Sequence, residues 1–264
     1  MPRRAAAPTP PPVDIRLMNA TATLLYVACG VLVLAALAWW AVRHPLFALT
    51  GITVQGDVAH TSAPTLRANV APSVAGNFFT IDLAAARQAF EDVPWVRRAV
   101  VRREFPSRLR VTLEEHHPVA LWGAEGDSTL VNSFGEVFEA NPDEAEEDLP
   151  RLGGPQEQSA QVLQAWHALA PLFEPLDLSV QQLVLTTRGS WQAELDTGAK
   201  LELGRGTPQE VAQRTQRFVR TLTEATGRYG RRPEALLAAD LRHADGYAIR
   251  LRGVSTVGAE AQKK

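Results

Sequence analysis

Cysteine is nearly missing from this chain of 264 residues. Cys29 is the single example, so an intramolecular disulfide is excluded. Lysine is almost as scarce, because it occurs only at Lys200, Lys263 and Lys264. Positive charge therefore comes almost entirely from arginine. The formal net charge is −2, which argues against a general affinity of the whole molecule for nucleic acid or anionic surfaces.

Motifs of catalysis and metal binding are also few. Glu114-Glu115-His116-His117 resembles a metal cluster, but neighbouring side chains on a strand point to opposite faces and do not chelate one ion, so we interpret the motif as part of an exposed strand. Gly204-Arg205-Gly206 precedes a predicted helix without the spacing or the lysine of a phosphate loop. The acidic loop at 143–148 is interpreted as a solvated loop. We expect no catalytic residue, no metal site and no cofactor.

One long apolar run dominates the N-terminal part. No charged residue occurs from Leu17 to Val42. As a helix, Ala22–Val42 extends about 32 Å, which matches a hydrocarbon core of about 30 Å. Trp39 and Trp40 end the run, and such rings favour the headgroup layer. We predict a transmembrane helix at 21–43.

A cleaved signal peptide is the alternative, since Ala36-Leu37-Ala38 supplies an A-x-A site. The apolar stretch exceeds the usual h-region and continues into Trp-Trp, which favours an uncleaved anchor. Arg3, Arg4 and Arg16 make the N-terminal flank the more basic one, so that side is expected in the cytoplasm and the rest of the chain outside it. Cys29 lies within the span, a poor place for a nucleophile.

The Pro/Ala-rich segment 1–20 is predicted to be a disordered cytoplasmic tail. A first domain is expected at 46–117. It would comprise a strand at 47–55, a short helix from Pro64 to Val70, a helix from the N-cap Asp82 to Pro94 and two strands joined by a turn at Pro106-Ser107. The order β-α-α-β-β indicates a small α+β domain.

Six arginines are concentrated between Pro94 and Val111: Arg97, Arg98, Arg102, Arg103, Arg108 and Arg110. Alternation places Ala99, Val101 and Phe105 on one face of the first strand and leaves most of the arginines on the solvated faces. Glu104, Glu114 and Glu115 partly offset their charge. We interpret the run mainly as a wet face, with a docking surface as the alternative.

A second domain is predicted at 118–254, with a disordered tail at 255–264. Strands are expected at 118–123 and 129–139, the latter with a turn at 133–135, and then at 180–187, 191–196 and 200–203. A helix is expected at 158–173, and a second one is opened by the capping box Thr207-Pro208-Gln209-Glu210. Ala239–Arg252 is predicted to form one strand with a turn or bulge at Asp245-Gly246.

Several short motifs occur together with the single N-terminal apolar segment. They are Phe78-Phe79…Asp82-Leu83, Pro94-Trp95-Val96…Val101-Arg102-Arg103…Pro106…Leu109…Val111, Glu115…Pro118-Val119-Ala120…Trp122, Ser190-Trp191…Leu201-Glu202-Leu203-Gly204-Arg205-Gly206 and Asp240-Leu241-Arg242…Gly246-Tyr247-Ala248-Ile249-Arg250. In combination with that anchor they are specific, and they resemble the FtsQ/DivIB family of bacterial cell-division proteins.

This resemblance implies a POTRA domain, a C-terminal β-domain and a non-enzymatic, single-pass scaffold of the inner membrane at the division septum. It also implies that a segment of FtsB, in complex with FtsL, adds to the last strand of the β-domain. The positions that match this site are Arg188 and the run Arg242, His243, Ala244, Asp245, Gly246, Tyr247, Ala248, Ile249, Arg250 and Leu251. The family's usual aromatic after Asp-Leu-Arg is His243 in this sequence. The upstream recruiter FtsK is expected to bind at Val101 and Arg103.

Edge-strand physics favours the same site. An exposed terminal strand offers unpaired N–H and C=O groups to a partner strand. Arg242, Arg250 and Arg252 discourage self-pairing and suit an acidic partner. The strand backbone is expected to supply register, with apolar anchoring by Tyr247 and Leu251.

The sequence leaves two other functions open. A POTRA-bearing component of polypeptide transport or outer-membrane assembly would predict repeated POTRA units or a downstream transmembrane β-barrel, neither of which the sequence indicates. A cell-wall enzyme on a membrane stalk would predict turnover of peptidoglycan precursors by the exported part.

Overall fold

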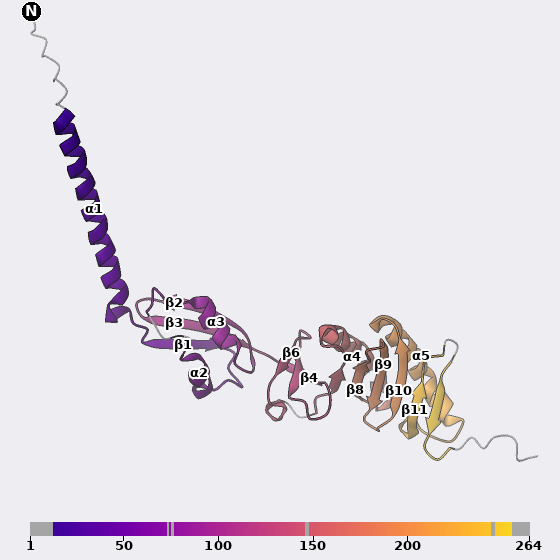
Figure 1. Cartoon of the computed structure of the whole chain (residues 1–264). Helices are drawn as coiled ribbons and strands as arrows, with labels where there is room; N and C mark the ends of the chain where they lie inside the picture. The colour runs from indigo at the N-terminus through magenta and orange to yellow at the C-terminus, as the bar shows by residue number, and fades with distance from the viewer. Residues whose placement is uncertain (1–12, 73, 75–76, 146–147, 244–245, 255–264) are drawn as a thin grey trace, which may run out of the picture. The chain divides into compact units, whose positions relative to one another are not determined.

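The computed structural model describes residues 13–72, 74, 77–145, 148–243 and 246–254. The predicted tails at 1–12 and 255–264 lie outside these residues, as do Ala244 and Asp245. The described chain begins with the helix α1, Val13–Arg43 (Figure 1). Within it, Leu17–Ala41 is long and apolar enough to cross a membrane. The helix starts earlier than predicted, so residues 13–20 are helical and are not a disordered tail.

The first compact unit contains a three-stranded sheet with two helices. A 3-10 helix, Pro45–Phe47, precedes the strand β1, Gly51–Gly56. The helices are α2, Ala63–Val70, and α3, Leu83–Glu91. The long strands β2, Val96–Glu104, and β3, Arg108–Glu115, follow. The β-α-α-β-β order and the α+β class are confirmed.

In this sheet, β3 is central and β1 runs parallel to it, with Ile52 opposite Leu109 and Val54 opposite Val111. Leu109, Val111 and Leu113 are buried while Arg108, Arg110 and Thr112 are exposed. This is the alternation of a half-buried strand. The predicted N-cap is confirmed, because Asp82 Oδ1 accepts hydrogen bonds from the N–H groups of Ala84 and Ala85.

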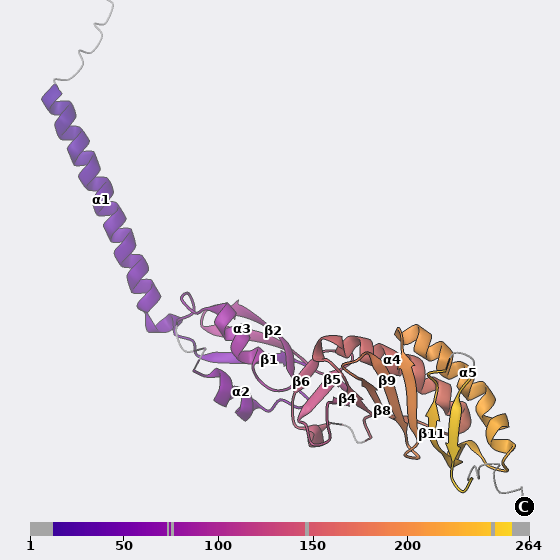
Figure 2. The same cartoon turned by 45° about the vertical axis from the view of Figure 1, so that its right-hand side comes forward.

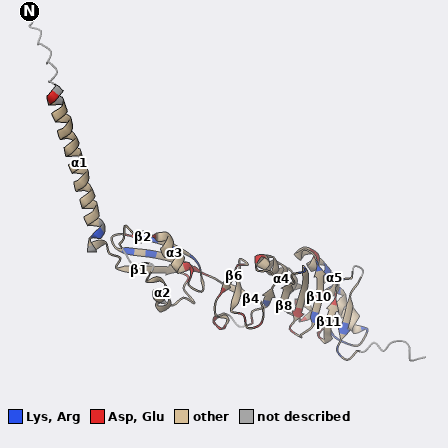
Figure 3. Cartoon of the chain, in the orientation of Figure 1, with Lys and Arg blue, Asp and Glu red and all other residues tan. Residues whose placement is uncertain are grey.

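Most arginines of the run lie on the wet side of this sheet, as predicted; Figure 3 marks lysine and arginine in blue along its strands. Arg110 pairs with Glu104. Arg97 is the departure: its side chain is only 14% exposed and lies between Glu114 and Glu136. The placement of Phe105 on the packed face was wrong, because its side chain is 73% exposed. It stands beyond the end of β2, where the sheet no longer covers it.

The second unit is built on a nine-stranded mixed sheet. Its strand order is β12-β11-β10-β9-β8-β7-β4-β5-β6. The bounds are β4 Pro118–Trp122, β5 Thr129–Asn132, β6 Val137–Glu139, β7 Arg151–Gly153, β8 Val180–Leu185, β9 Ser190–Leu195, β10 Lys200–Arg205, β11 Leu236–Asp240 and β12 Ala248–Leu251. The short strands β7 and β11 were not predicted.

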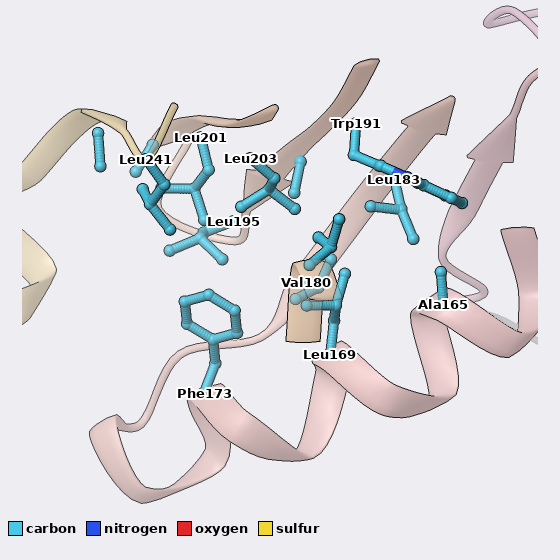
Figure 4. Close-up of a cluster of buried hydrophobic side chains, with 14 of the residues drawn as sticks. Ala165, Leu169, Phe173, Val180, Leu183, Trp191, Leu195, Leu201, Leu203 and Leu241 are labelled. Atoms are coloured by element: carbon cyan, nitrogen blue, oxygen red, sulfur yellow. The ribbon is translucent and has the colours of Figure 1, made fainter. Parts of the chain in front are cut away.

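Two helices cover one face of this sheet: α4, Ser159–Phe173, and α5, Pro208–Gly227 (Figure 2). Short 3-10 helices occur in the connections at Pro142–Glu144, Gln156–Gln158, Glu174–Leu176 and Pro233–Ala235. Trp191, Phe173 and Phe218 are among the largest fully buried side chains. Figure 4 shows Leu169 and Phe173 of α4 beneath the leucines of β8 to β10. This apolar layer is the main stabilising term, at about 1.5–3 kcal/mol per buried large side chain.

The predicted single strand Ala239–Arg252 was wrong. Residues 236–251 form two antiparallel strands, β11 and β12, in which Asp240 lies opposite Ala248 and Leu236 opposite Leu251. Leu241 N still donates to Glu202 O of β10 at 2.8 Å. Directly afterwards, Asp240 Oδ1 accepts from Arg242 N at 3.0 Å, an Asx-type bond that turns the chain away from the sheet.

Glu115 was also misjudged as part of an exposed strand. Its side chain is buried and accepts hydrogen bonds from His60 N at 2.9 Å and Thr61 N at 2.8 Å. His116 follows the end of β3 and stacks on Phe138 with the ring centroids 4.1 Å apart. Burial lowers the pKa of His116, and the Arg97 charge acts in the same direction. Within the described residues, no group of three or more metal-ligating side chains occurs.

Candidate partner-binding surfaces

The strand β12 is the last strand at one border of the nine-stranded sheet. It pairs with β11 alone, and no other strand of the described chain lies along its outer side. Its four residues alternate: Ala248 and Arg250 are exposed, whereas Ile249 is half-buried and Leu251 buried. An edge of this kind leaves backbone N–H and C=O groups for another chain.

The side chains of Tyr247 and Leu251, beside and within β12, contact other residues of the same domain. The ring of Tyr247 meets Phe218 of α5 edge-on with the centroids 4.9 Å apart, and its hydroxyl lies 2.8 Å from Thr221 Oγ1. Leu251 is only 4% exposed, so its side chain belongs to the core. Apolar anchoring of a partner by Leu251 is therefore not supported, and its backbone is the part left for pairing.

Arg242 stands at the start of the connection between β11 and β12 and is clamped by Asp240. Its Nε and Nη2 donate to the two carboxylate oxygens at 2.8 and 2.6 Å. This bidentate pair lowers the pKa of Asp240 to about 2 and raises the pKa of Arg242. The Arg242 side chain is still 58% exposed, so it presents a preorganised cation to the solvent.

Arg188 and Arg242 line the same open groove, although they come from distant parts of the sequence. Arg188 is exposed in the turn between β8 and β9, which Gly189 N closes by donating to Thr186 O at 2.8 Å. The groove has a volume of about 760 Å³. We call it the arginine groove; it is lined by Thr186, Thr187, Arg188, Ser190, Gln192, Glu202, Gly204, Arg205, Arg214 and Arg242.

Four arginines and one carboxylate line the arginine groove, so it favours an acidic ligand. Arg214 of α5 is fixed there, because its guanidinium donates to Leu203 O and, at 3.2 Å, to Arg205 O. The single acid, Glu202, accepts from Gln192 Nε2 at 2.9 Å. The sequence prediction missed Arg205 and Arg214.

A second groove of about 330 Å³ lies between α5 and the β11–β12 connection. We call it the tyrosine groove; it is lined by Arg214, Arg217, Phe218, Thr221, Leu241, His243, Gly246 and Tyr247. Arg214 lines both grooves. The helical spacing of Arg214, Arg217 and Thr221 puts them on one stripe of α5, which is the sequence signal that was available for finding them.

The other predicted site, Val101 and Arg103, lies on β2 at the border of the three-stranded sheet. Val101 is half-buried and lines a groove of about 440 Å³ against α3, together with Leu83, Arg87, Glu91, Arg98, Ala99 and Val100. Arg103 donates to the carbonyls of Phe78 and Ile81, both at 2.8 Å. Ala99 N donates to Glu91 Oε1 at 3.1 Å, so this position of the β2 backbone already has a partner within the domain.

Fold and surfaces define a class of protein: a helix suited to anchoring in a membrane, followed by a β-α-α-β-β domain and a β-rich domain with an open sheet border. The family model described as "POTRA domain, FtsQ-type" matches residues 47–116, and "Cell division protein FtsQ/DivIB, C-terminal" matches residues 120–242. The second match ends at Arg242, before β12.

Curated relatives agree with these matches. The chain is 39% identical over 242 residues to "Cell division protein FtsQ" of Burkholderia pseudomallei, covering 91% of this chain and 94% of that protein. It is 40% identical over 257 residues to the protein of that name from Bordetella pertussis, covering 90% and 92%. It is 38% identical to that of Thiomonas arsenitoxydans, covering 96% and 93%. The chain belongs to the FtsQ/DivIB family of cell-division proteins.

Proposed function

We propose that this protein is a non-enzymatic scaffold of the division machinery in the bacterial inner membrane. In this proposal, α1 anchors the chain with its N-terminus in the cytoplasm. The two folded domains lie in the periplasm at the septum, where they link early to late division proteins. Family membership supports a role in cell division, and the apolar helix fits a membrane anchor.

FtsB, in complex with FtsL, is the proposed partner of the β-domain. A segment of FtsB would add as a further strand to β12, and its acidic side chains would bind Arg188 and Arg242 in the arginine groove. The observation that supports this most is the open border of β12, in the same sheet as β10, which lines the arginine groove together with Arg242. Backbone pairing supplies affinity and register in such complexes, while charge supplies specificity and speed of association.

FtsK is the proposed upstream partner, at Val101 and Arg103. The groove between β2 and α3 supports a side-chain docking mode here. Strand addition along β2 is disfavoured at Ala99, because Glu91 already accepts from its N–H group. This contact argues against the alternative of a transport component that passes polypeptide along the POTRA edge.

The β12 site is tested by calorimetry, which measures the affinity of the FtsB/FtsL complex for the full chain in nanodiscs. Arg250→Glu reverses an exposed charge on β12, and we expect the affinity to fall about tenfold or more. Gly246→Pro, which removes a backbone donor beside the strand, is expected to weaken binding as well. Arg220→Glu is the matched control, because Arg220 is exposed on α5 and lines neither groove.

Unchanged affinity of both β12 variants would rule out this site. A fluorescent fusion tests the cellular role: depletion should produce filaments, and the fusion should gather at midcell. Turnover of peptidoglycan precursors by the purified chain would instead favour a membrane-anchored enzyme.

A further inference from the structure

Three large apolar side chains close to the end of α1 are exposed. Leu46 is 70%, Phe79 49% and Phe105 73% exposed. They come from three separate segments: the 3-10 helix after α1, the loop before α3 and the turn between β2 and β3. Single exposed apolar residues are ordinary on a protein surface, but a group of them indicates an interaction site.

Ring contacts connect these segments. Phe47 and Phe79 lie 4.9 Å apart between ring centroids, Phe78 and Phe79 5.3 Å, and Phe78 and Phe105 6.1 Å. Phe78 N donates to Phe47 O at 2.8 Å, which ties the loop to the chain leaving α1. Phe78 itself is buried. We call Leu46, Phe47, Phe79 and Phe105 the aromatic patch.

The length of the connection keeps Leu46, at the start of the aromatic patch, near the membrane in any orientation of the domain. Leu46 is the third residue after Arg43, where α1 ends, so at most about 11 Å of extended chain separates their Cα atoms. The headgroup layer on each side of a bilayer is about 5–8 Å thick. Trp39 and Trp40 precede by one turn, with Arg43 Cζ 4.1 Å from the centroid of the Trp39 ring, an arrangement typical of a membrane interface.

The charge beside the patch suits phosphate headgroups. The exposed Arg108 follows the turn that bears Phe105 and supplies this charge, because the Arg103 guanidinium already donates to the carbonyls of Phe78 and Ile81. The neighbouring acid, Glu104, is paired with Arg110. Aromatic rings next to arginines are well placed at the boundary between headgroups and acyl chains.

Loop backbone groups in the patch are satisfied within the domain. Phe79 N donates to Asn77 Oδ1 at 3.0 Å, and Phe47 N donates to His44 O at 3.0 Å. The patch therefore offers side chains and not an open strand edge. This favours a lipid surface over an added peptide strand as its occupant.

We propose that the aromatic patch inserts into the periplasmic headgroup boundary of the membrane that α1 crosses, and so holds the POTRA domain against the bilayer. The proposal rests on the part of the proposed function that places α1 across a membrane. It adds a second, peripheral membrane contact that would limit how far the domain swings about its short connection.

Spin-label depth measurement on the full chain tests this proposal. The chain is placed in nanodiscs of phosphatidylethanolamine and phosphatidylglycerol, and a nitroxide is attached at Thr80→Cys in a Cys29→Ala background. Thr80 is exposed and adjoins Phe79. Collision with oxygen and with a water-soluble nickel chelate reports the depth of the label. We expect it to lie at the headgroup boundary.

Phe105→Ser and Leu46→Ser should each lower about tenfold the ratio of POTRA domain held at the membrane to POTRA domain away from it. The reason is that each change removes a large apolar side chain from the interface with lipid. Both residues are highly exposed in the protein, so folding should be retained. Val58→Ser is the matched control: Val58 is apolar and 43% exposed, and it follows the end of β1 that is farther along the chain from Leu46.

A nitroxide label on native Cys29 distinguishes failure of patch insertion from failure of the membrane anchor. If that label is buried in lipid while the Thr80→Cys label is fully accessible to the nickel chelate, insertion of the patch is overturned and the anchor stands. If the Cys29 label is also accessible to water, the anchor fails as well. If Phe105→Ser weakens FtsB/FtsL binding without changing the label depth, the patch contacts protein and the proposal is overturned.

Discussion

Among the six arginines between Pro94 and Val111, Arg97 has the most closely constrained guanidinium group. It donates to Glu136 Oε2 at 2.7 Å and to Glu114 Oε1 at 2.6 Å, and its guanidinium carbon lies 3.8 Å from the centroid of the Phe134 ring. Sequence alternation assigned the arginines to a solvated face without distinguishing this one. Its partner Glu136 lies in the turn after β5 and is far from it in sequence, so only the folded chain brings the pair together.

The acid dependence of stability can be predicted from Glu136. Hydrogen bonds from Arg97 lower its pKa to about 2, against a smaller opposing effect of burial. A carboxylate whose pKa is lower in the folded state stabilises the fold fully above its unfolded pKa of about 4.3. That contribution is lost as the pH falls through about 2. Because the side chain is 49% exposed, solvent screens the effect.

Urea denaturation of the full chain in detergent, monitored by tryptophan fluorescence between pH 7 and pH 2.5, measures this effect. We expect Glu136→Gln to be less stable than the parent at pH 7 and to lose less of its stability at low pH. Glu125→Gln, at an exposed loop position, is the control. If the parent and Glu136→Gln have parallel pH profiles, the proposed role of the pair is wrong.

At the scale of elements, α5 determines the shape of both grooves. Its buried residues, among them Val211, Phe218 and Leu222, pack on the sheet, while Arg214 and Thr221 lie in the grooves. The predicted capping box is confirmed: Glu210 N donates to Thr207 Oγ1, and Thr207 N donates to Glu210 Oε2 at 2.8 Å. Because the capping box fixes the residue at which α5 begins, it also fixes the position of Arg214 along the helix axis relative to β10.

Thr207→Ala should destabilise the β-domain by about 1 kcal/mol, because the N–H group of Glu210 loses its side-chain acceptor. Thermal unfolding measures the loss. Thr223→Ala, at an exposed interior position of the same helix, should be neutral or slightly stabilising. Equal destabilisation by the two changes would show that the effect belongs to threonine in general and not to the cap.

At the scale of the whole molecule, the proposed function depends on the apolar helix α1 staying in the mature chain. The cleavage alternative at Ala36-Leu37-Ala38 makes a different prediction about the mature N-terminus. We expect the intact mass of the membrane-extracted protein to include the residues before Trp39. We also expect alkaline phosphatase to be active when fused after Lys264 and inactive when fused after Pro12. A mature chain that starts at Trp39 would contradict the anchor.

Local patterns predicted much of this fold. Alternation identified β3, strand-like runs bounded by turn residues indicated β8 and β9, side-chain oxygens identified the caps of α3 and α5, and an uninterrupted apolar run identified α1. Three-residue strands such as β7 are too short to have a recognisable period. Glu115 was misjudged because the donors that satisfy its buried carboxylate, His60 and Thr61, come from another part of the chain.

The sequence by itself determined the long apolar helix, the β-α-α-β-β order of the first domain and the family, because these depend on composition, period and short motifs along the chain. Only the tertiary structure decided that β11 lies between β10 and the border strand β12 and that Arg188, Arg214 and Arg242 line one groove. It also decided that Leu251 is a core residue. The physical reason is that edges and grooves are made by contacts between residues remote in sequence, and no local period reports those contacts.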